Sequence, residues 1–169
     1  TRRGRAAVPD VTALAGTAVV AARGGSATVI DAWYAALAKP WFQPPGLVFP
    51  LAWTTLYILF TLSIGRAWNR IRHHEAKRAL VSLLNVNAIL NVLWSVLFFW
   101  ARRPDLALIE IFPFWLSTLL PLMLLWRHDR VAAWLFAPYL AWVSFAALIN
   151  FAIVALNPPF GWLPFGWGH

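Results

Sequence analysis

The 169-residue sequence contains no cysteine and few charged residues, and each shortage excludes a class of protein. Without cysteine, neither a disulfide framework nor a thiolate-ligated metal site can form. Charged residues make up 12% of the chain and hydrophobic residues 61%, whereas soluble globular domains average about 25% and about 45–50%. So few charges cannot cover a surface that faces water. The composition therefore predicts that much of the surface faces lipid.

The excess of basic residues does not indicate a nucleic-acid-binding protein. The formal net charge is +8, but Lys and Arg lie between apolar runs rather than along one polar face. The sequence contains no recognisable recognition helix or RNA-binding module. These cations are instead typical of the segments that flank membrane spans.

Apolar runs separated by short polar segments predict an all-α membrane protein, a single domain over residues 1–169 that forms a bundle of five transmembrane helices. Arg23 interrupts the first run, so a signal peptide is the alternative interpretation there. A polar loop over Asn69–Arg78 is expected after the second span, and Asp105 is expected to be the N-cap of the fourth. The five expected spans cover about residues 9–30, 49–68, 79–100, 106–126 and 131–156.

The segment between the first two expected spans, residues 31–48, is predicted to cover a ligand as a rigid loop. Pro40, Pro44 and Pro45 each fix φ and lack an N–H donor, so Lys39 to Gly46 is expected to be extended. Lys and Arg are more numerous on the side of the expected amino terminus, which the positive-inside rule places in the cytoplasm. The sequence thus favours a multi-pass protein of a bacterial membrane over one of the mitochondrial outer membrane.

Aromatic and amide side chains recur on one face of three expected spans. Such stripes have two interpretations: they pack helix faces and form hydrogen bonds between helices, or they line a cavity for a large ring system. The three stripes and the rigid loop together favour the cavity. The stripes comprise Trp53, Tyr57 and Phe60; Asn87, Asn91, Trp94, Ser95 and Phe98; and Tyr139, Trp142, Ala146, Ile149 and Asn150.

Few residues offer catalytic or metal chemistry. No histidine or cysteine lies in an expected span, and Met123 is the one methionine, which argues against an axially ligated haem. No nucleophile–base pair, phosphate-binding loop or zinc spacing is present, so no catalytic residue, metal ligand or required cofactor is expected. Glu110 is a functional candidate as a carboxylate inside a span; alternatively, it reaches back toward Arg102 or Arg103 at the interface.

Several rare residues occur in a characteristic order over the last four expected spans. They are Trp33-Tyr34, Leu37, Lys39-Pro40, Pro44-Pro45, Phe49, Trp53, Leu56-Tyr57, Leu90-Asn91, Trp94-Ser95, Phe98-Phe99, Ala107-Leu108, Pro138 to Trp142, Phe145, Asn150 and Asn157. This order resembles the translocator protein family, also called the tryptophan-rich sensory protein or peripheral benzodiazepine receptor family. The resemblance covers about residues 33–157.

The resemblance implies a five-helix bundle that forms homodimers in a bacterial or mitochondrial outer membrane. It also implies a pocket under the first loop for porphyrins such as protoporphyrin IX and for isoquinoline or benzodiazepine drugs. Phe49 and Tyr57, from the same stretch as the matching Trp53, complete the expected ligand-binding set. The residues that match the pocket of the family are Tyr34, Trp53, Asn87, Asn91, Trp94, Trp142, Ala146 and Ile149.

The chain departs from the pattern of the family at a few positions. Asn87 stands where the family often has glutamine, and Leu106 stands where some members have tryptophan. Phe151 and Ala155 replace the Tyr and Arg of the cholesterol motif found in animal members, so sterol recognition is not expected.

The expected function is that of a membrane receptor or translocator-like protein, with a sensory or transport role, that binds porphyrins and similar flat apolar ligands. Tryptophans stack on the macrocycle, Asn87, Asn91 and Tyr34 orient its polar edge, and Arg23 or Lys39 meets its propionates. One alternative is an enzyme that degrades porphyrins with light or oxygen through pocket tryptophans. A second alternative is a proton-coupled small-molecule exporter that uses the carboxylate in the fourth span.

Overall fold

The computed structural model describes residues 32–158 and 160, and every regular element within them is a helix. The expected first span, about residues 9–30, lies outside the described residues. Four helical segments are long and apolar enough to cross a membrane, with η1 continuing α4. The elements are α2 (Ala32–Ala36), α3 (Val48–Arg70), α4 (His74–Ser95), the π-helix η1 (Val96–Trp100), α5 (Pro104–His128) and α6 (Arg130–Leu156).

Each of the four later expected spans coincides with one of these long segments, but two local predictions are wrong. The expected polar loop over Asn69–Arg78 is reduced to the three residues 71–73, because α3 runs to its last residue at position 70 and α4 begins at His74. Asp105 is not the N-cap of α5. That position belongs to Arg103, whose Nε and Nη2 donate to the two carboxylate oxygens of Asp105 at 2.9 and 2.6 Å.

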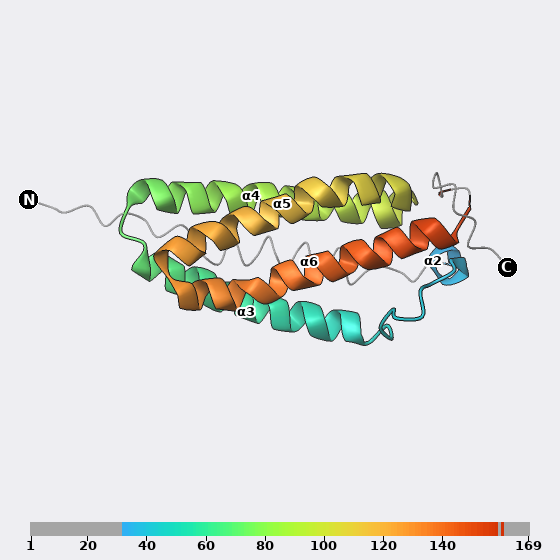
Figure 1. The fold of residues 1–169 in the computed structure, drawn as a ribbon, viewed down its shortest axis with the longest axis horizontal. Helices are drawn as coiled ribbons and strands as arrows, with labels where there is room; N and C mark the ends of the chain where they lie inside the picture. Colours follow the sequence, from blue (N-terminus) through green and yellow to red (C-terminus); the bar gives the residue numbers. More distant parts are fainter. Residues whose placement is uncertain (1–31, 159, 161–169) are drawn as a thin grey trace, which may run out of the picture.

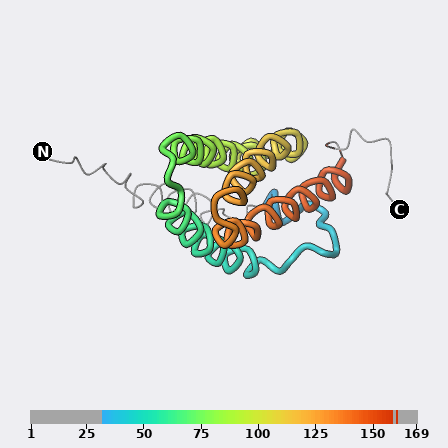
Figure 2. Tube along the Cα trace, turned by 60° about the vertical axis from the view of Figure 1, so that its left-hand side comes forward, coloured from blue at the N-terminus to red at the C-terminus, as the bar shows by residue number. Residues whose placement is uncertain are grey.

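The long helices lie side by side in the order α3, α6, α5, α4, with α3 and α4 on opposite sides of the bundle (Figures 1 and 2). Small residues allow α3 and α6 to approach closely. Ser63, Ala67, Ala132 and Ala133 are fully buried, and Ser63 Oγ donates to the carbonyl oxygen of Ala132 at 2.7 Å. The backbones of α3 and α6 therefore meet with little side-chain volume between them.

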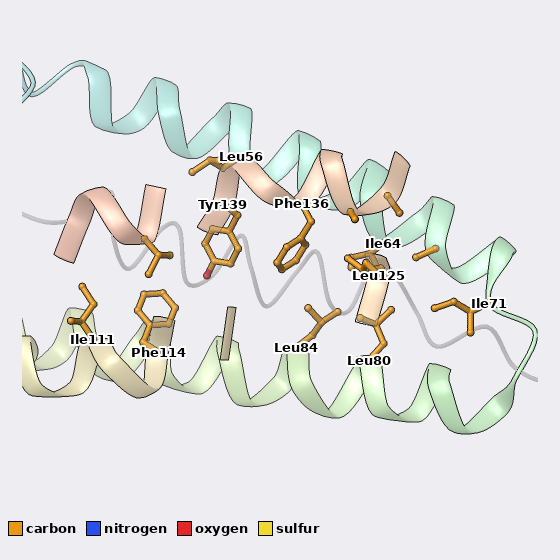
Figure 3. Packing of buried hydrophobic residues seen from close by; sticks show 14 residues of the cluster. Leu56, Ile64, Ile71, Leu80, Leu84, Ile111, Phe114, Leu125, Phe136 and Tyr139 are labelled. Carbon is orange, nitrogen blue, oxygen red and sulfur yellow. The ribbon is translucent and has the colours of Figure 1, made fainter. Parts of the chain in front are cut away.

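Large apolar side chains from all four long segments fill the middle of the bundle (Figure 3). Leu56 of α3, Leu84 of α4, Phe114 of α5 and Phe136 of α6 are among them. A second buried cluster forms at the end of the bundle that carries α2, which we call the loop end. Its buried members are Phe98, Ala107, Ile149 and Ile153.

The opposite end of the bundle is held by Asp129, the N-cap of α6. Its Oδ1 accepts hydrogen bonds from the backbone N–H groups of Val131 and Ala132 at 2.9 and 3.1 Å. Its Oδ2 lies 2.9 Å from Nε of Arg66, near the end of α3. One carboxylate thus caps α6 and joins it to α3.

The connection between α2 and α3 is less extended than the prolines predicted. Residues 32–36 form α2, the N–H of Gln43 donates to the carbonyl oxygen of Pro40 at 3.0 Å, and that of Val48 donates to Pro45 at 2.9 Å. The chain from residue 37 to residue 47, which we call the covering loop, therefore turns twice before α3 begins. In Figures 1 and 2 it runs from α2, beside the last turns of α6, to the start of α3.

Candidate functional site

Tyr34 lies in a cluster of rings at the loop end of the bundle. Its ring centroid is 6.2 Å from that of Phe98 and 5.7 Å from that of Phe99. Trp94 stacks on Phe98 with centroids 5.2 Å apart. The π-helical turn η1 carries Phe98 and Phe99, and such turns are frequent at functional sites. The structure therefore brings Tyr34 and Trp94, which lie 60 positions apart, against the same pair of phenylalanines.

The hydroxyl group of Tyr34 accepts a hydrogen bond from Nε2 of Gln43 at 3.1 Å. Burial raises the pKa of Tyr34 above its usual value, and the bond with Gln43 offsets only part of this rise. The phenol therefore stays protonated at neutral pH and has an O–H to donate. Gln43 was not among the residues expected at the site, and the only sequence signal for it was a single amide among the prolines and aromatics of the covering loop.

A row of aromatic rings joins α3 to α6. Trp53 stacks on Tyr57 with centroids 5.5 Å apart and lies 6.4 Å from Trp142. Phe49 meets Trp142 edge to face at 5.8 Å. The four expected site residues of this row are thus in direct contact. Edge-to-face and offset arrangements of this kind are the favoured geometries of aromatic pairs.

Asn87 and Asn91 of α4 meet through Tyr139, which was expected in an aromatic stripe but not in the ligand-binding set. Its hydroxyl donates to Oδ1 of Asn87 at 3.0 Å, and Nδ2 of Asn91 donates to that hydroxyl at 3.3 Å. Nδ2 of Asn87 lies 3.0 Å from Oγ of Ser117 and 2.8 Å from Oγ1 of Thr118. Both ends of the Asn87 amide are therefore used to join α4, α5 and α6.

Ile149 is buried in the cluster at the loop end, and Ala146 packs against the main core on the same helix. Phe42 and Leu37 of the covering loop pack against the cluster that holds Ile149. The covering loop therefore closes the loop end of the bundle. The ammonium group of Lys39 lies 5.0 Å from the ring centroid of Tyr34, and its Nζ donates to the carbonyl oxygens of residues 35 and 37.

Three residues have buried polar atoms without a hydrogen-bond partner in the part of the chain that the structure describes. They are Oε1 of Gln43, Nε1 of Trp94 and both carboxylate oxygens of Glu110. Buried polar groups are normally satisfied, so each exception calls for an explanation. The carboxylate of Glu110 forms no hydrogen bond with a described residue, and Arg103 bonds to Asp105 instead. All three residues belong to the half of the bundle nearer to the covering loop.

Two hollows of the described chain lie apart from most of the expected ligand-binding set. One, of about 760 Å³, lies outside the bundle between the covering loop and α6, and the other, of about 390 Å³, lies along α3. Of the ten expected residues, Tyr57 alone lines one of them, the second. The larger hollow is lined by Lys39, Pro40, Trp41, Phe42, Phe145, Leu148, Phe151, Ala152, Ala155 and Leu156.

Comparison with known proteins identifies related sequences over most of the chain. Residues 11–156 match the model of the TspO/MBR family. The chain is 35% identical over 127 residues to Protein CrtK of Rhodobacter capsulatus, covering 75% of this chain and 79% of that protein. It is 34% identical over 132 residues to Tryptophan-rich protein TspO of Archaeoglobus fulgidus, covering 78% and 84%. It is 29% identical over 122 residues to the human Translocator protein, covering 72% of each.

Proposed function

The chain belongs to the TspO/MBR family, and from this premise we propose that it is a multi-pass membrane receptor or translocator-like protein that binds porphyrins and similar flat apolar ligands in its loop-end half. The ligand enters beneath the covering loop and stacks against indole and phenol rings. A bacterial membrane and a homodimer belong to the same proposal. Relatives from Rhodobacter and Archaeoglobus support the prokaryotic assignment.

One observation carries the proposal: the buried polar atoms without a described partner gather among the aromatic rings. Gln43 bonds Tyr34, Tyr34 and Trp94 share contacts with the phenylalanines of η1, and Gln43 and Trp94 each keep one buried unpaired atom. Leaving such atoms unpaired costs about 1–3 kcal/mol each. An interior with large apolar rings and a few unpaired polar atoms suits a ligand that is mostly apolar and carries a few polar groups.

We propose that Lys39 meets the carboxylates of a porphyrin, together with Arg23, which lies outside the described residues. Lys39 is at the mouth of the loop end, and its ammonium group is already held over the ring of Tyr34. The Lys39→Gln/Arg23→Gln double variant should bind protoporphyrin IX more weakly at low salt, where exposed charges are least screened. Unchanged affinity at low salt would exclude this role.

The experiment that tests the proposed function is a binding screen of the purified protein in detergent. Protoporphyrin IX, haem, a sterol and an isoquinoline drug are titrated, and tryptophan fluorescence is followed. Saturable quenching by protoporphyrin IX and by the isoquinoline, with no Soret shift typical of axial ligation for haem, supports the proposal. Absence of saturable quenching by every flat ligand would reject it.

A further inference from the structure

Helical spacing places Trp94 and Glu110 on facing positions of the antiparallel pair formed by α4 and α5. The pairing of these helices is fixed by the hydrogen bond from Asn87 to Ser117, at 3.0 Å. Trp94 is seven residues after Asn87, and Glu110 is seven residues before Ser117. Seven residues make almost two turns of an α-helix, so both steps return to the same face and advance about 10 Å in the same direction. The two residues are therefore expected at one level of the bundle, on the facing sides of α4 and α5.

Both groups at this level are buried and unpaired. Glu110 is 7% exposed, and neither of its oxygens has a partner among residues 32–158 and 160. Nε1 of Trp94 is likewise buried without an acceptor in the described chain. Glu110 is six positions after Pro104 at the start of α5, which places it about 9 Å below that helix end. Both residues thus lie inside expected membrane spans, in the half of the bundle nearer to the covering loop.

The chemistry of the pair defines what it would bind. Burying a carboxylate without a hydrogen-bond donor costs far more free energy than burying a neutral carboxylic acid. We therefore expect Glu110 to be protonated. It then has one O–H to donate, and Trp94 has one N–H. A carbonyl oxygen has two lone pairs and accepts both bonds. A ligand with one carbonyl at this level would pair two groups that are otherwise unsatisfied.

We propose that Trp94 and Glu110 form the polar subsite of the ligand cavity, and that this subsite recognises an uncharged carbonyl oxygen on an otherwise apolar, flat ligand. The inference rests on the proposed function, because it assumes that such a ligand occupies the loop-end half. It assigns the two residues distinct donor roles. It also separates this deeper subsite from the position of Lys39 at the mouth, where charged carboxylates belong.

The test uses two uncharged porphyrins and the full chain in detergent. Protoporphyrin IX dimethyl ester carries carbonyl oxygens, whereas etioporphyrin carries alkyl groups alone. The wild-type protein should bind the ester about tenfold more tightly, as read by tryptophan quenching. This preference for the ester over etioporphyrin should disappear in E110L and fall in W94F. It should persist in E110Q, because glutamine has a similar shape and keeps an N–H donor. W100F is the matched control for W94F, because Trp100 is 83% exposed.

The outcomes separate a failure of the subsite from a failure of the proposed function. If etioporphyrin and the ester bind the wild-type protein equally, the subsite is rejected while the proposed function stands. If the preference survives in both E110L and W94F, the subsite is also rejected. Loss of the preference in E110Q would show an ionised carboxylate that holds a cationic or N–H group, and would overturn the assignment to a carbonyl. If neither porphyrin quenches, the proposed function fails and the subsite fails with it.

Discussion

Asn157 and Ala38 are 119 positions apart in the chain, and they exchange hydrogen bonds in both directions. The N–H of Ala38 donates to Oδ1 of Asn157 at 2.8 Å, and Nδ2 of Asn157 donates to the carbonyl oxygen of Ala38 at 2.9 Å. The same Nδ2 also donates to the carbonyl oxygen of Ile153 at 2.8 Å. The side chain that follows α6 therefore holds the backbone at the start of the covering loop.

Replacing Asn157 with alanine should loosen the covering loop. The change removes all three hydrogen bonds, each worth about 0.5–1.5 kcal/mol, without removing apolar packing of the loop. Chymotrypsin should then cut after Trp41 or Phe42 several times faster than in the wild-type protein. Trp41 is already 95% exposed, so cleavage depends on the mobility of the backbone rather than on access to the ring. Equal cleavage rates would show that the packing of the loop, and not Asn157, holds it.

Asn85→Ala is the matched control for this experiment, because Asn85 is an exposed asparagine on α4. It should leave the chymotrypsin pattern unchanged.

The bond between Tyr139 and Asn87 should stabilise the bundle measurably. In a double-mutant cycle of Asn87→Ala and Tyr139→Phe, we expect a coupling free energy of about 0.6 kcal/mol, the average for interhelical hydrogen bonds in membranes. The measurement is thermal or denaturant unfolding in detergent. Tyr57→Phe is the control, because the hydroxyl of Tyr57 has no hydrogen bond to another described residue. Strict additivity of the two single changes would refute a direct contribution of the bond.

Asp129 should make the stability depend on pH in the acid range. Burial alone would raise the pKa of Asp129, but hydrogen bonds from the N–H of Ala132 and from Arg66 outweigh it and hold this pKa below its usual value. A lowered folded-state pKa gives stability that is complete above the unfolded pKa of about 3.9 and is lost as the pH falls through the folded pKa.

Asp129→Asn keeps a capping side chain but loses the charge. It should therefore be less stable than the wild-type protein from pH 5 to 8, and the difference should shrink below about pH 4. Unfolding in detergent across this range measures it, with the exposed Glu75→Gln as control. A difference that grows as the pH falls would contradict the assignment.

The close approach of α3 and α6 should not tolerate a larger side chain. Ala67 is fully buried, one turn after Ser63, which bonds Ala132 across the interface. Ala67→Leu adds volume where the backbones leave none and should destabilise the protein by about 1–3 kcal/mol. Ala88→Leu, on an exposed face of α4, should change stability by less than about 0.5 kcal/mol. Similar unfolding temperatures for the two variants would show that the interface can widen.

The long helices could be predicted from the sequence because each corresponds to a long apolar run. Runs such as residues 79–100 carry no charge, and a run of that length is typical of a membrane span. The ends of the helices were harder to predict. Arg103 and Asp105 show why: an acidic residue at a helix start fits both an N-cap and a first-turn ion pair, and only the backbone geometry separates the two.

The covering loop and the polar contacts depend on partners that are distant in the chain. Prolines predicted an extended segment, but they do not exclude the turn closed by Pro40 and Gln43. Helical spacing placed Asn87 and Asn91 on one face, yet it did not indicate that Tyr139 from another helix would join them. Such contacts are set by the packing of whole helices, which periodicity within one helix does not encode.

Protoporphyrin IX titration of tryptophan variants tests most directly whether aromatic rings of α3 and α6 hold a flat ligand under the covering loop. Trp53→Leu/Trp142→Leu should lower the affinity at least about tenfold, since two stacking indoles together contribute about 1.4 kcal/mol or more. Trp126→Leu, which removes a ring of the exposed Trp126–Trp134 pair, should leave the affinity unchanged. Equal affinity in the double variant and the wild-type protein would show that these rings do not hold the ligand.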